Sequence, residues 1–422
     1  MATHNRWVIA AAGVLMQVAL GAVYAWSVFR IPLTTTFGWT ISEVTLTFTI
    51  AIFVLGLAAF GGGLWMRRAG PRTVALTAGV LYGLGVFLAS LSGGRLWWLY
   101  CSYGVIASVG LGLGYIVPVA TLVKWFPDKR GLITGLAVAG FGAGALITAP
   151  IATRLIASVG VLQTFAVLGA AYFVAVTAGA LFMRNPPDGY QPPARDGLKA
   201  VPYDAAQRGV APLGGTRGVG DGVQAFPSYT LGEAMRSWQW YGLWTLLFLN
   251  TTAGIAVISQ AAPMFQEITR ISAVRAASIV GVISIANGAG RLLWAWLSDL
   301  VGRRPVFLAM FLLQAIIFWL LPSAHSLTLF AALTAAVLLC YGGGFGTMPA
   351  FAADYFGAEH VGSIYGLMLT AWGVAGVLGP TLIAALRERS GGYDGALRLI
   401  AGLMLVSAVI PLIVRPPASA PR

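Results

Sequence analysis

Residues 276–306 read AASIVGVISIANGAGRLLWAWLSDLVGRRPV, and this stretch decides the fold class. From Ala276 to Leu297 it holds one charged residue, Arg291, among mostly apolar and small residues. About 20 such residues are needed for a helix to cross a bilayer. We therefore predict a membrane-spanning helix that ends at a short charged loop.

The whole chain has the composition of an integral membrane protein. Of its 422 residues 58% are hydrophobic and 9% are charged, whereas a soluble domain carries about 25% charged residues. Its mean hydropathy is +0.82. We predict twelve membrane-spanning helices, at residues 7–35, 43–66, 73–92, 96–122, 130–155, 161–183, 238–262, 275–299, 305–322, 326–352, 361–386 and 395–414.

Residues 184–237 interrupt this pattern, because they are rich in Pro, Gly and charge and contain no long apolar run. Such composition is typical of a flexible linker. We predict a six-helix half at 1–183, a linker at 184–237 and a second six-helix half at 238–422. The end of the linker, SYTLGEAMRSWQW at 228–240, suggests a short amphipathic helix.

The distribution of Lys and Arg predicts the orientation. With the N-terminus inside, the cytoplasmic segments carry 17 of these residues and the opposite side carries 8. Positive residues are enriched in cytoplasmic loops. We therefore expect both termini and the linker in the cytoplasm. As a separate expectation, the protein is a monomer in the inner membrane of a bacterium.

The two halves repeat each other in their loops. LWMRRAGPRTV at 64–74 matches WLSDLVGRRPV at 296–306, with Gly70 aligned to Gly302 and Arg72 to Arg304. KWFPDKRGLITGL at 124–136 matches DYFGAEHVGSIYGL at 354–367 in an aromatic pair and a Gly-Leu pair. Parallel six-helix repeats place a substrate site at their interface near the middle of the membrane.

Several function classes find no support in the sequence. The net charge of +13 is scattered between apolar segments, which argues against nucleic-acid binding. His4, His325 and His360 are the only histidines and lie far apart, and no Ser/His/Asp set or Gly-Lys-Ser/Thr phosphate loop is visible. We expect no enzyme, no metal and no cofactor.

Arg291 is the leading candidate for a binding residue. A permanent charge inside a membrane helix is costly and normally faces the protein interior or a water-filled cavity with an anionic partner. No Asp or Glu lies between Ala276 and Leu297, so a carboxylate substrate is the natural partner. The alternative is that the side chain reaches along the helix to the membrane surface.

Other polar and aromatic residues fit around such a site. Asn287 lies four residues before Arg291, on the same helix face, where it would orient the guanidinium or make an interhelical hydrogen bond. Tyr115 offers a hydroxyl to a carboxylate, or packs internally. Tyr341 and Phe345 share a face and either wall a pocket or belong to the core.

The chain resembles the major facilitator superfamily, and within it the oxalate/formate antiporter and bacterial monocarboxylate (lactate) transporter group. The resemblance rests on GAVYAWSVFRIPL at 21–33, on residues 112–145 and on IANGAGRLLWAWLSD at 285–299. It implies an all-α membrane fold of two pseudo-symmetric six-helix bundles and secondary transport. It also implies that Arg291 binds the substrate carboxylate, and adds Tyr24, Phe141, Leu369 and Trp372 by analogy.

Two departures from the family pattern are informative. The first half has Arg67 where the family's loop signature has Asp, which weakens this loop as a conformational latch. Oxalate antiporters are similar in helix 11 but carry a lysine there, whereas this chain has Trp372 nearby and no Lys or Arg between Gly362 and Leu386. One cation suits one carboxylate.

These features favour symport of a small monocarboxylate such as lactate or pyruvate with a proton, with an oxalate/formate exchanger as the alternative. Asn287 cannot titrate, so proton coupling needs another group. Glu267 and Arg387 lie near the outer ends of two helices. We expect them to form an external gate, or Glu267 to carry the proton.

Overall fold

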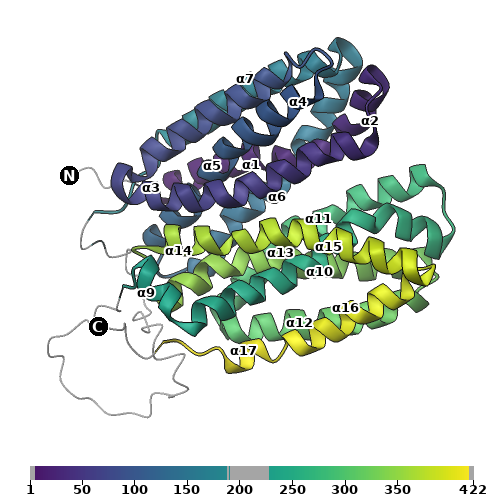
Figure 1. The fold of residues 1–422 in the computed structure, drawn as a ribbon. Coiled ribbons are helices and arrows are strands. Elements are labelled where there is room, and N and C mark those ends of the chain that lie inside the picture. Colours follow the sequence, from purple (N-terminus) through teal and green to yellow (C-terminus); the bar gives the residue numbers. More distant parts are fainter. Residues whose placement is uncertain (1–4, 188–189, 191–227, 418–422) are drawn as a thin grey trace, which may run out of the picture.

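The computed structural model describes residues 5–187, 190 and 228–417, and its regular elements are all helices (Figure 1). The first half comprises α1 (Arg6–Leu20), η1 (Gly21–Ala25), α2 (Trp26–Phe37), α3 (Ile41–Ala89), α4 (Leu96–Leu99), η2 (Tyr100–Ala107), α5 (Ser108–Trp125), α6 (Arg130–Val159) and α7 (Val161–Ala180). The second half comprises α9 (Leu231–Arg236), α10 (Trp238–Thr269), α11 (Ala273–Val301), α12 (Arg303–Leu320), η3 (Leu321–Ser323), α13 (Leu327–Phe356), α14 (Val361–Met368), α15 (Thr370–Ser390), α16 (Asp394–Ser407) and α17 (Ile410–Ile413).

These elements form the twelve predicted spans. Ten helical stretches are long and apolar enough to cross a membrane. One of them, 42–89, has 48 residues, about twice the length of a single span. Gly70 divides it, because its backbone at φ 75° is left-handed and turns the chain back. Helix α11 supplies the twelfth span.

The helices form two bundles that lie side by side, the first purple to teal and the second green to yellow (Figure 1). The described residues next to the linker are fixed at one end of the bundles. Trp125 donates to the Arg184 carbonyl at 2.7 Å, and the Tyr229 amide donates to the Phe356 carbonyl at 3.0 Å. We call this the linker end and the opposite end the far end.

The short helix expected before the second half is present as α9. Thr230 and Glu233 form a capping box at its start, in which each side chain accepts from the backbone amide of the other. Most of the predicted linker, residues 188–189 and 191–227, lies outside the described residues.

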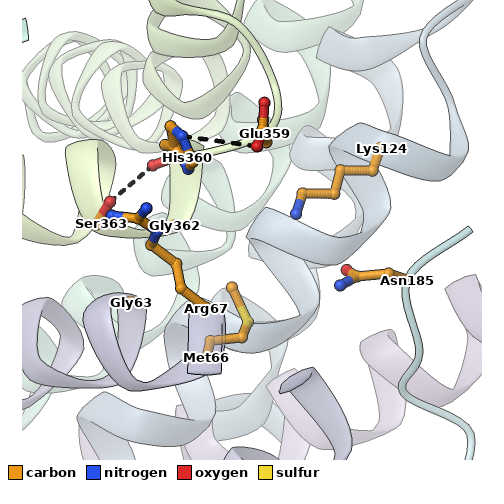
Figure 2. A pocket seen from close by; sticks show the side chains of 9 residues that line it. All are labelled: Gly63, Met66, Arg67, Lys124, Asn185, Glu359, His360, Gly362 and Ser363. Atoms are coloured by element: carbon orange, nitrogen blue, oxygen red, sulfur yellow. Dashed lines mark hydrogen bonds and ion pairs between the residues drawn. The ribbon is translucent and has the colours of Figure 1, made fainter. Parts of the chain in front are cut away.

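The two halves meet along two seams. On the first seam α6 packs against α11 and α13, and on the second α3 packs against α14 and α15. Gly63 is required on the second seam, because a Cβ there would lie 2.1 Å from the Gly362 carbonyl oxygen. At the linker end of this seam a pocket lies between the halves (Figure 2).

The seams close the linker end. Glycine contacts between the halves run from Gly131 against the Ala295 carbonyl to Gly142 against Gly288, which is near the level of Arg291. Toward the far end the bundles diverge, with α2 and the start of α11 well apart (Figure 1). The structure therefore represents the conformation in which the halves are closed at the linker end.

Candidate binding site around a buried arginine

Arg291 lies midway along α11 at the boundary between the halves, with 1% of its surface exposed. Glycines on α13 set its depth, because a Cβ at Gly346 would lie 2.0 Å from the Arg291 carbonyl oxygen. A Cβ at Gly342 would likewise lie 2.0 Å from the Asn287 carbonyl oxygen. Small residues let membrane helices approach in this way. The side chain is thus fully inside the protein and does not reach the membrane surface.

The hydrogen bonds of the Arg291 guanidinium go to neutral groups. Its Nη1 donates to the Val138 carbonyl at 3.1 Å, its Nη2 to the Tyr24 hydroxyl at 3.4 Å and its Nε to the Asn287 side-chain oxygen at 3.4 Å. Two of the three distances exceed the usual range for N–H···O hydrogen bonds. Asn287 thus occupies the position expected from its spacing.

Arg303 provides an internal comparison, because it is also 1% exposed. It pairs with Asp299 at 2.7 Å and with Asp354 at 2.8 Å. Within the described ranges no carboxylate lies within 4.0 Å of Arg291. A buried charge without a counter-charge is strongly destabilising, and Arg291 lacks the charge compensation that the two carboxylates give Arg303.

Aromatic faces surround the Arg291 charge. The guanidinium carbon lies 5.3 Å from the ring centre of Phe345, 5.7 Å from that of Phe141 and 5.8 Å from that of Tyr24. These distances are within the range of cation–π attraction. The rings stabilise the cation partly and leave its charge uncompensated.

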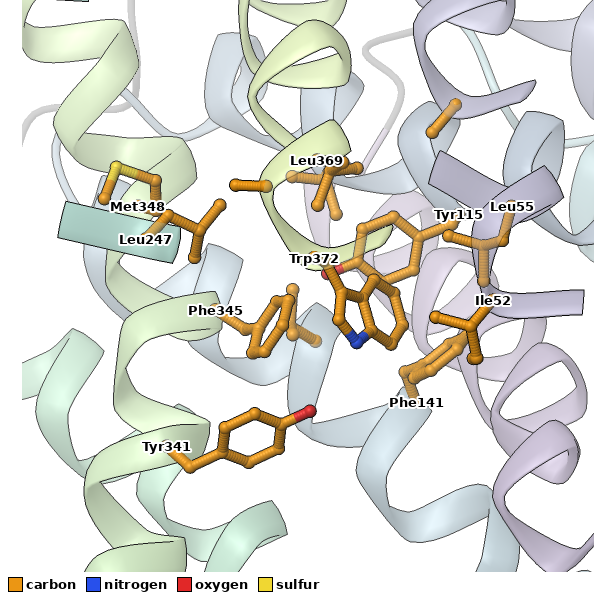
Figure 3. Packing of buried hydrophobic residues seen from close by; sticks show 14 of the residues in the cluster. Ile52, Leu55, Tyr115, Phe141, Leu247, Tyr341, Phe345, Met348, Leu369 and Trp372 are labelled. Carbon is orange, nitrogen blue, oxygen red and sulfur yellow. The ribbon is translucent and has the colours of Figure 1, made fainter. Parts of the chain in front are cut away.

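Trp372 lies at the centre of the same ring cluster (Figure 3). Its ring centre is 5.0 Å from that of Phe345, 6.1 Å from those of Phe141 and Tyr115, and 6.2 Å from that of Tyr24. The predicted span 361–386 is divided into α14 and α15 at Leu369, which is fully buried. Because of this division, Trp372 lies in the first turn of α15, where its ring is part of the cluster.

Three donor groups of the cluster are buried and make no hydrogen bond of normal geometry with the described residues, although the Tyr115 and Tyr365 hydroxyls interact with each other and the Trp372 N–H interacts with Tyr341. They are the Tyr115 hydroxyl, the Trp372 indole N–H and the Tyr365 hydroxyl. A buried unsatisfied donor costs about 1–3 kcal/mol. Together with the guanidinium, they form a donor-rich site that suits a ligand rich in acceptors.

Tyr365 was missed by the sequence prediction. It precedes Trp372 by seven residues, which places both near one face of the same helix. A tyrosine at that spacing in an apolar segment was therefore a usable signal. The nine predicted substrate residues lie around the boundary of the halves, three from the first half (Tyr24, Tyr115, Phe141) and six from the second (Asn287, Arg291, Tyr341, Phe345, Leu369, Trp372).

Tyr341 closes the site on the side of the second half. Its ring packs edge-on against Phe345 at 5.3 Å, and its hydroxyl points toward the middle of the ring cluster (Figure 3). Gly254 on α10 makes room for it, because a Cβ there would lie 2.3 Å from the Tyr341 ring. The site thus has polar groups on two sides and apolar rings between them.

Glu267 and Arg387 form the ion pair predicted from the sequence, at 2.8 Å near the far end. Both belong to the second half, Glu267 to α10 and Arg387 to α15. The pair therefore joins two helices of one bundle and does not bridge the halves. The role of this pair as an external gate stays a prediction.

Charged residues at the linker end bridge the first seam, which the sequence prediction did not foresee. The Asp299 carboxylate accepts from the backbone amides of Gly131 at 2.9 Å and Leu132 at 2.7 Å, at the start of α6. Arg130 of the first half pairs with Asp354 of the second at 2.9 Å. A helix N-terminus favours a carboxylate, so these contacts stabilise closure.

No group of three His, Cys, Asp or Glu side chains that could hold a metal ion is found in the part of the chain that the structure describes.

Comparison with protein families gives one family model, "Major Facilitator Superfamily", which matches residues 9–291 and 243–422. An uncharacterized MFS-type transporter of Escherichia coli (strain K12), YhjX, is 30% identical over 89% of this chain and 86% of its own. The oxalate:formate antiporter of Oxalobacter formigenes is 25% identical over 98% and 93%. The apicoplast pyruvate carrier 1 of Toxoplasma gondii is 26% identical over 79% and 68%.

Among solved structures, the fucose:proton symporter FucP of E. coli is similar with a TM-score of 0.68. It is 14% identical, and the match covers 98% of this chain and 100% of that one. This similarity shows a common fold.

Proposed function

Because the chain belongs to the major facilitator superfamily, we propose that this transporter carries small monocarboxylates, of the size of lactate or pyruvate, by alternating access. The observation that carries the proposal is Arg291, a buried cation whose surroundings hold no carboxylate among the described residues. Substrate binds between the halves with its carboxylate on the guanidinium.

The neighbouring groups complete the proposed complex. Among the described residues, the Tyr115 and Tyr365 hydroxyls and the Trp372 N–H make no hydrogen bond of normal geometry, and a carboxylate oxygen or a substrate hydroxyl would satisfy them. Phe141, Phe345 and the other rings enclose the short aliphatic part. A small apolar pocket with a few polar anchors is the usual form of a small-molecule site.

The number of cations favours a monocarboxylate. Between Gly362 and Leu386 the sequence has no Lys or Arg, and Trp372 stands inside the ring cluster. A dianion would therefore leave its second carboxylate buried without a cation, which is costly. Similarity to an oxalate:formate antiporter supports the alternative of an oxalate/formate exchanger, and similarity to a pyruvate carrier supports the monocarboxylate.

We further propose proton-coupled symport, with the linker end facing the cytoplasm of a bacterium and the protein acting as a monomer in the inner membrane. Glu267 is the candidate proton carrier, since its side chain is 33% exposed at the far end, where it pairs with Arg387. Glu267→Gln should retain exchange of labelled substrate but lose uptake driven by a pH gradient. If coupled uptake survives, Glu267 is not the carrier.

The deciding experiment is a proteoliposome panel with labelled lactate, pyruvate, formate, acetate and oxalate, with and without an inward proton gradient. We expect saturable uptake of the first two, accelerated by the gradient. If the protein instead prefers oxalate, uses formate as counter-substrate and does not respond to the gradient, it is an oxalate/formate exchanger and not a monocarboxylate symporter.

A further inference from the structure

Among the described residues, the second seam has no carboxylate latch and instead contains a basic pocket at the linker end (Figure 2). The pocket has a volume of about 280 Å³ and is lined from both halves. Arg67 and Lys124 come from the first half, and Glu359, His360 and the first residues of α14 come from the second. It is therefore complete only when the linker end is closed.

The internal repeat shows what occupies the equivalent place on the first seam. Aligning Gly70 with Gly302 makes Arg67 the counterpart of Asp299. Aligning the Gly-Leu pairs makes Gly362 and Ser363 the counterparts of Gly131 and Leu132, whose amides bind the Asp299 carboxylate at 2.9 and 2.7 Å. The start of α14 thus faces a cation where the start of α6 faces a carboxylate.

A second pair of equivalent residues in the two halves also carries opposite charges. Aligning the aromatic pairs of the two loops places Lys124 opposite Asp354, the residue that pairs with Arg130 and Arg303 on the first seam. Over the described residues, neither Arg67 nor Lys124 has a carboxylate within 4.0 Å. Both substitutions make this pocket more positive than its counterpart.

The other titratable groups of the pocket do not cancel this charge. Glu359 is the one acid in the lining, and its side chain is 66% exposed and lies 3.7 Å from His360. The Nδ1 atom of His360 is buried without a described hydrogen-bond partner. Burial and then Arg67 lower the pKa of His360, as expected next to positive charge.

We propose that this pocket binds a small oxyanion, a carboxylate or a phosphate group, between Arg67, Lys124 and the start of α14. The anion takes the place of the missing latch carboxylate and bridges the two halves. Because the pocket exists only in the closed arrangement of the linker end, the bound anion stabilises that conformation by mass action. This site is separate from Arg291 and does not depend on which acid is transported.

The test measures anion binding to the full-length protein in nanodiscs of phosphatidylcholine. The melting temperature is recorded against inorganic phosphate and against acetate, with chloride at equal ionic strength as reference. An Arg291→Ala background removes binding at the central site, so failure of the substrate proposal cannot affect the result. We expect a saturable rise with phosphate or acetate and none with chloride.

Two substitutions of Arg67 give different expectations for anion binding and for stability without anion. Arg67→Ala should raise the half-saturating anion concentration at least about tenfold, whereas Arg68→Ala, at an exposed neighbour outside the lining, should not change it. Arg67→Asp restores the carboxylate of the repeat. It should keep the anion-free melting temperature at or above that of the parent protein and abolish the response to anions.

The proposal is overturned if the parent protein does not respond, if chloride acts equally, or if Arg67→Asp responds like the parent. A further arm replaces part of the lipid by phosphatidylglycerol without free anion. Stabilisation there that depends on Arg67 identifies a lipid headgroup as the source of the oxyanion, whereas a response in phosphatidylcholine alone identifies a dissolved one.

Discussion

Replacing Arg291 by alanine tests the proposed substrate site most directly. The guanidinium is 1% exposed, so a bound carboxylate would interact with it out of contact with water. Truncating one partner of such a buried charge pair costs about 2–5 kcal/mol, which is about a 30-fold to several-thousand-fold loss of affinity. Arg291→Lys retains the charge but loses the planar pair of donors, and we expect its loss of affinity to lie within the same range.

The effect on folding should be small or of opposite sign. Two of the three hydrogen bonds of the side chain are 3.4 Å long, and no described carboxylate is left without its partner when the side chain is removed. Alanine also removes a buried uncompensated charge. The melting temperature without substrate should therefore not fall, which separates loss of binding from loss of structure.

The assay is uptake of labelled lactate into proteoliposomes, with substrate-induced thermal stabilisation as a binding measurement. Arg30→Ala is the control, because it removes one positive charge from an exposed position on α2. We expect parent-like uptake from Arg30→Ala and neither uptake nor stabilisation from Arg291→Ala. Near-parental lactate uptake by Arg291→Ala would refute the role of the guanidinium.

Four further predictions concern other parts of the molecule. Gly346→Ala places a Cβ 2.0 Å from a backbone oxygen of α11 and should cost about 1–3 kcal/mol in a denaturation curve, whereas Gly402→Ala, with open space, should not. Asp299→Asn weakens the cap on α6, and spin-label distances across the linker end should lengthen on average. Burial lowers the pKa of His360 in the folded protein, so below pH 6.5, the ordinary pKa of histidine, the unfolded chain binds more protons than the folded one. The melting temperature should therefore fall when the pH is lowered through this range, and it should fall less in His360→Gln. Trp372→Lys adds a second cation to the ring cluster, and oxalate should become a competitive inhibitor of lactate uptake.

Much of the fold could be predicted because apolar length and loop charge are local properties of the sequence. The backbone break at Gly70 was less accessible, since helical structure continues on both sides of the predicted loop. The depth at which a residue lies within the bundle also could not be predicted from the sequence. That Arg291 is fully buried depends on Gly342 and Gly346 of α13, which bring two distant segments into contact.

Around the site, spacing predicted neighbours on one helix better than partners across helices. Asn287 beside Arg291 follows from four-residue spacing, whereas the Val138 carbonyl that accepts from Arg291 is a backbone atom of α6 and has no sequence signal. Likewise, Asp299 was recognised as a loop residue, but its bonds to the amides of α6 depend on how the halves dock. The roles of these residues in substrate binding stay predictions until the variants are measured.

The ring-lined surroundings of Arg291 have a consequence for the transport cycle. Without an anion, the halves must rearrange around a guanidinium that, among the described residues, ring faces and neutral oxygens stabilise. With the proposed monocarboxylate bound, they would rearrange around a neutral pair, and we expect the barrier to be lower. We therefore expect the empty carrier to return slowly, so that substrate on the opposite side of the membrane accelerates efflux, and one-way accumulation is paced by the unloaded half of the cycle.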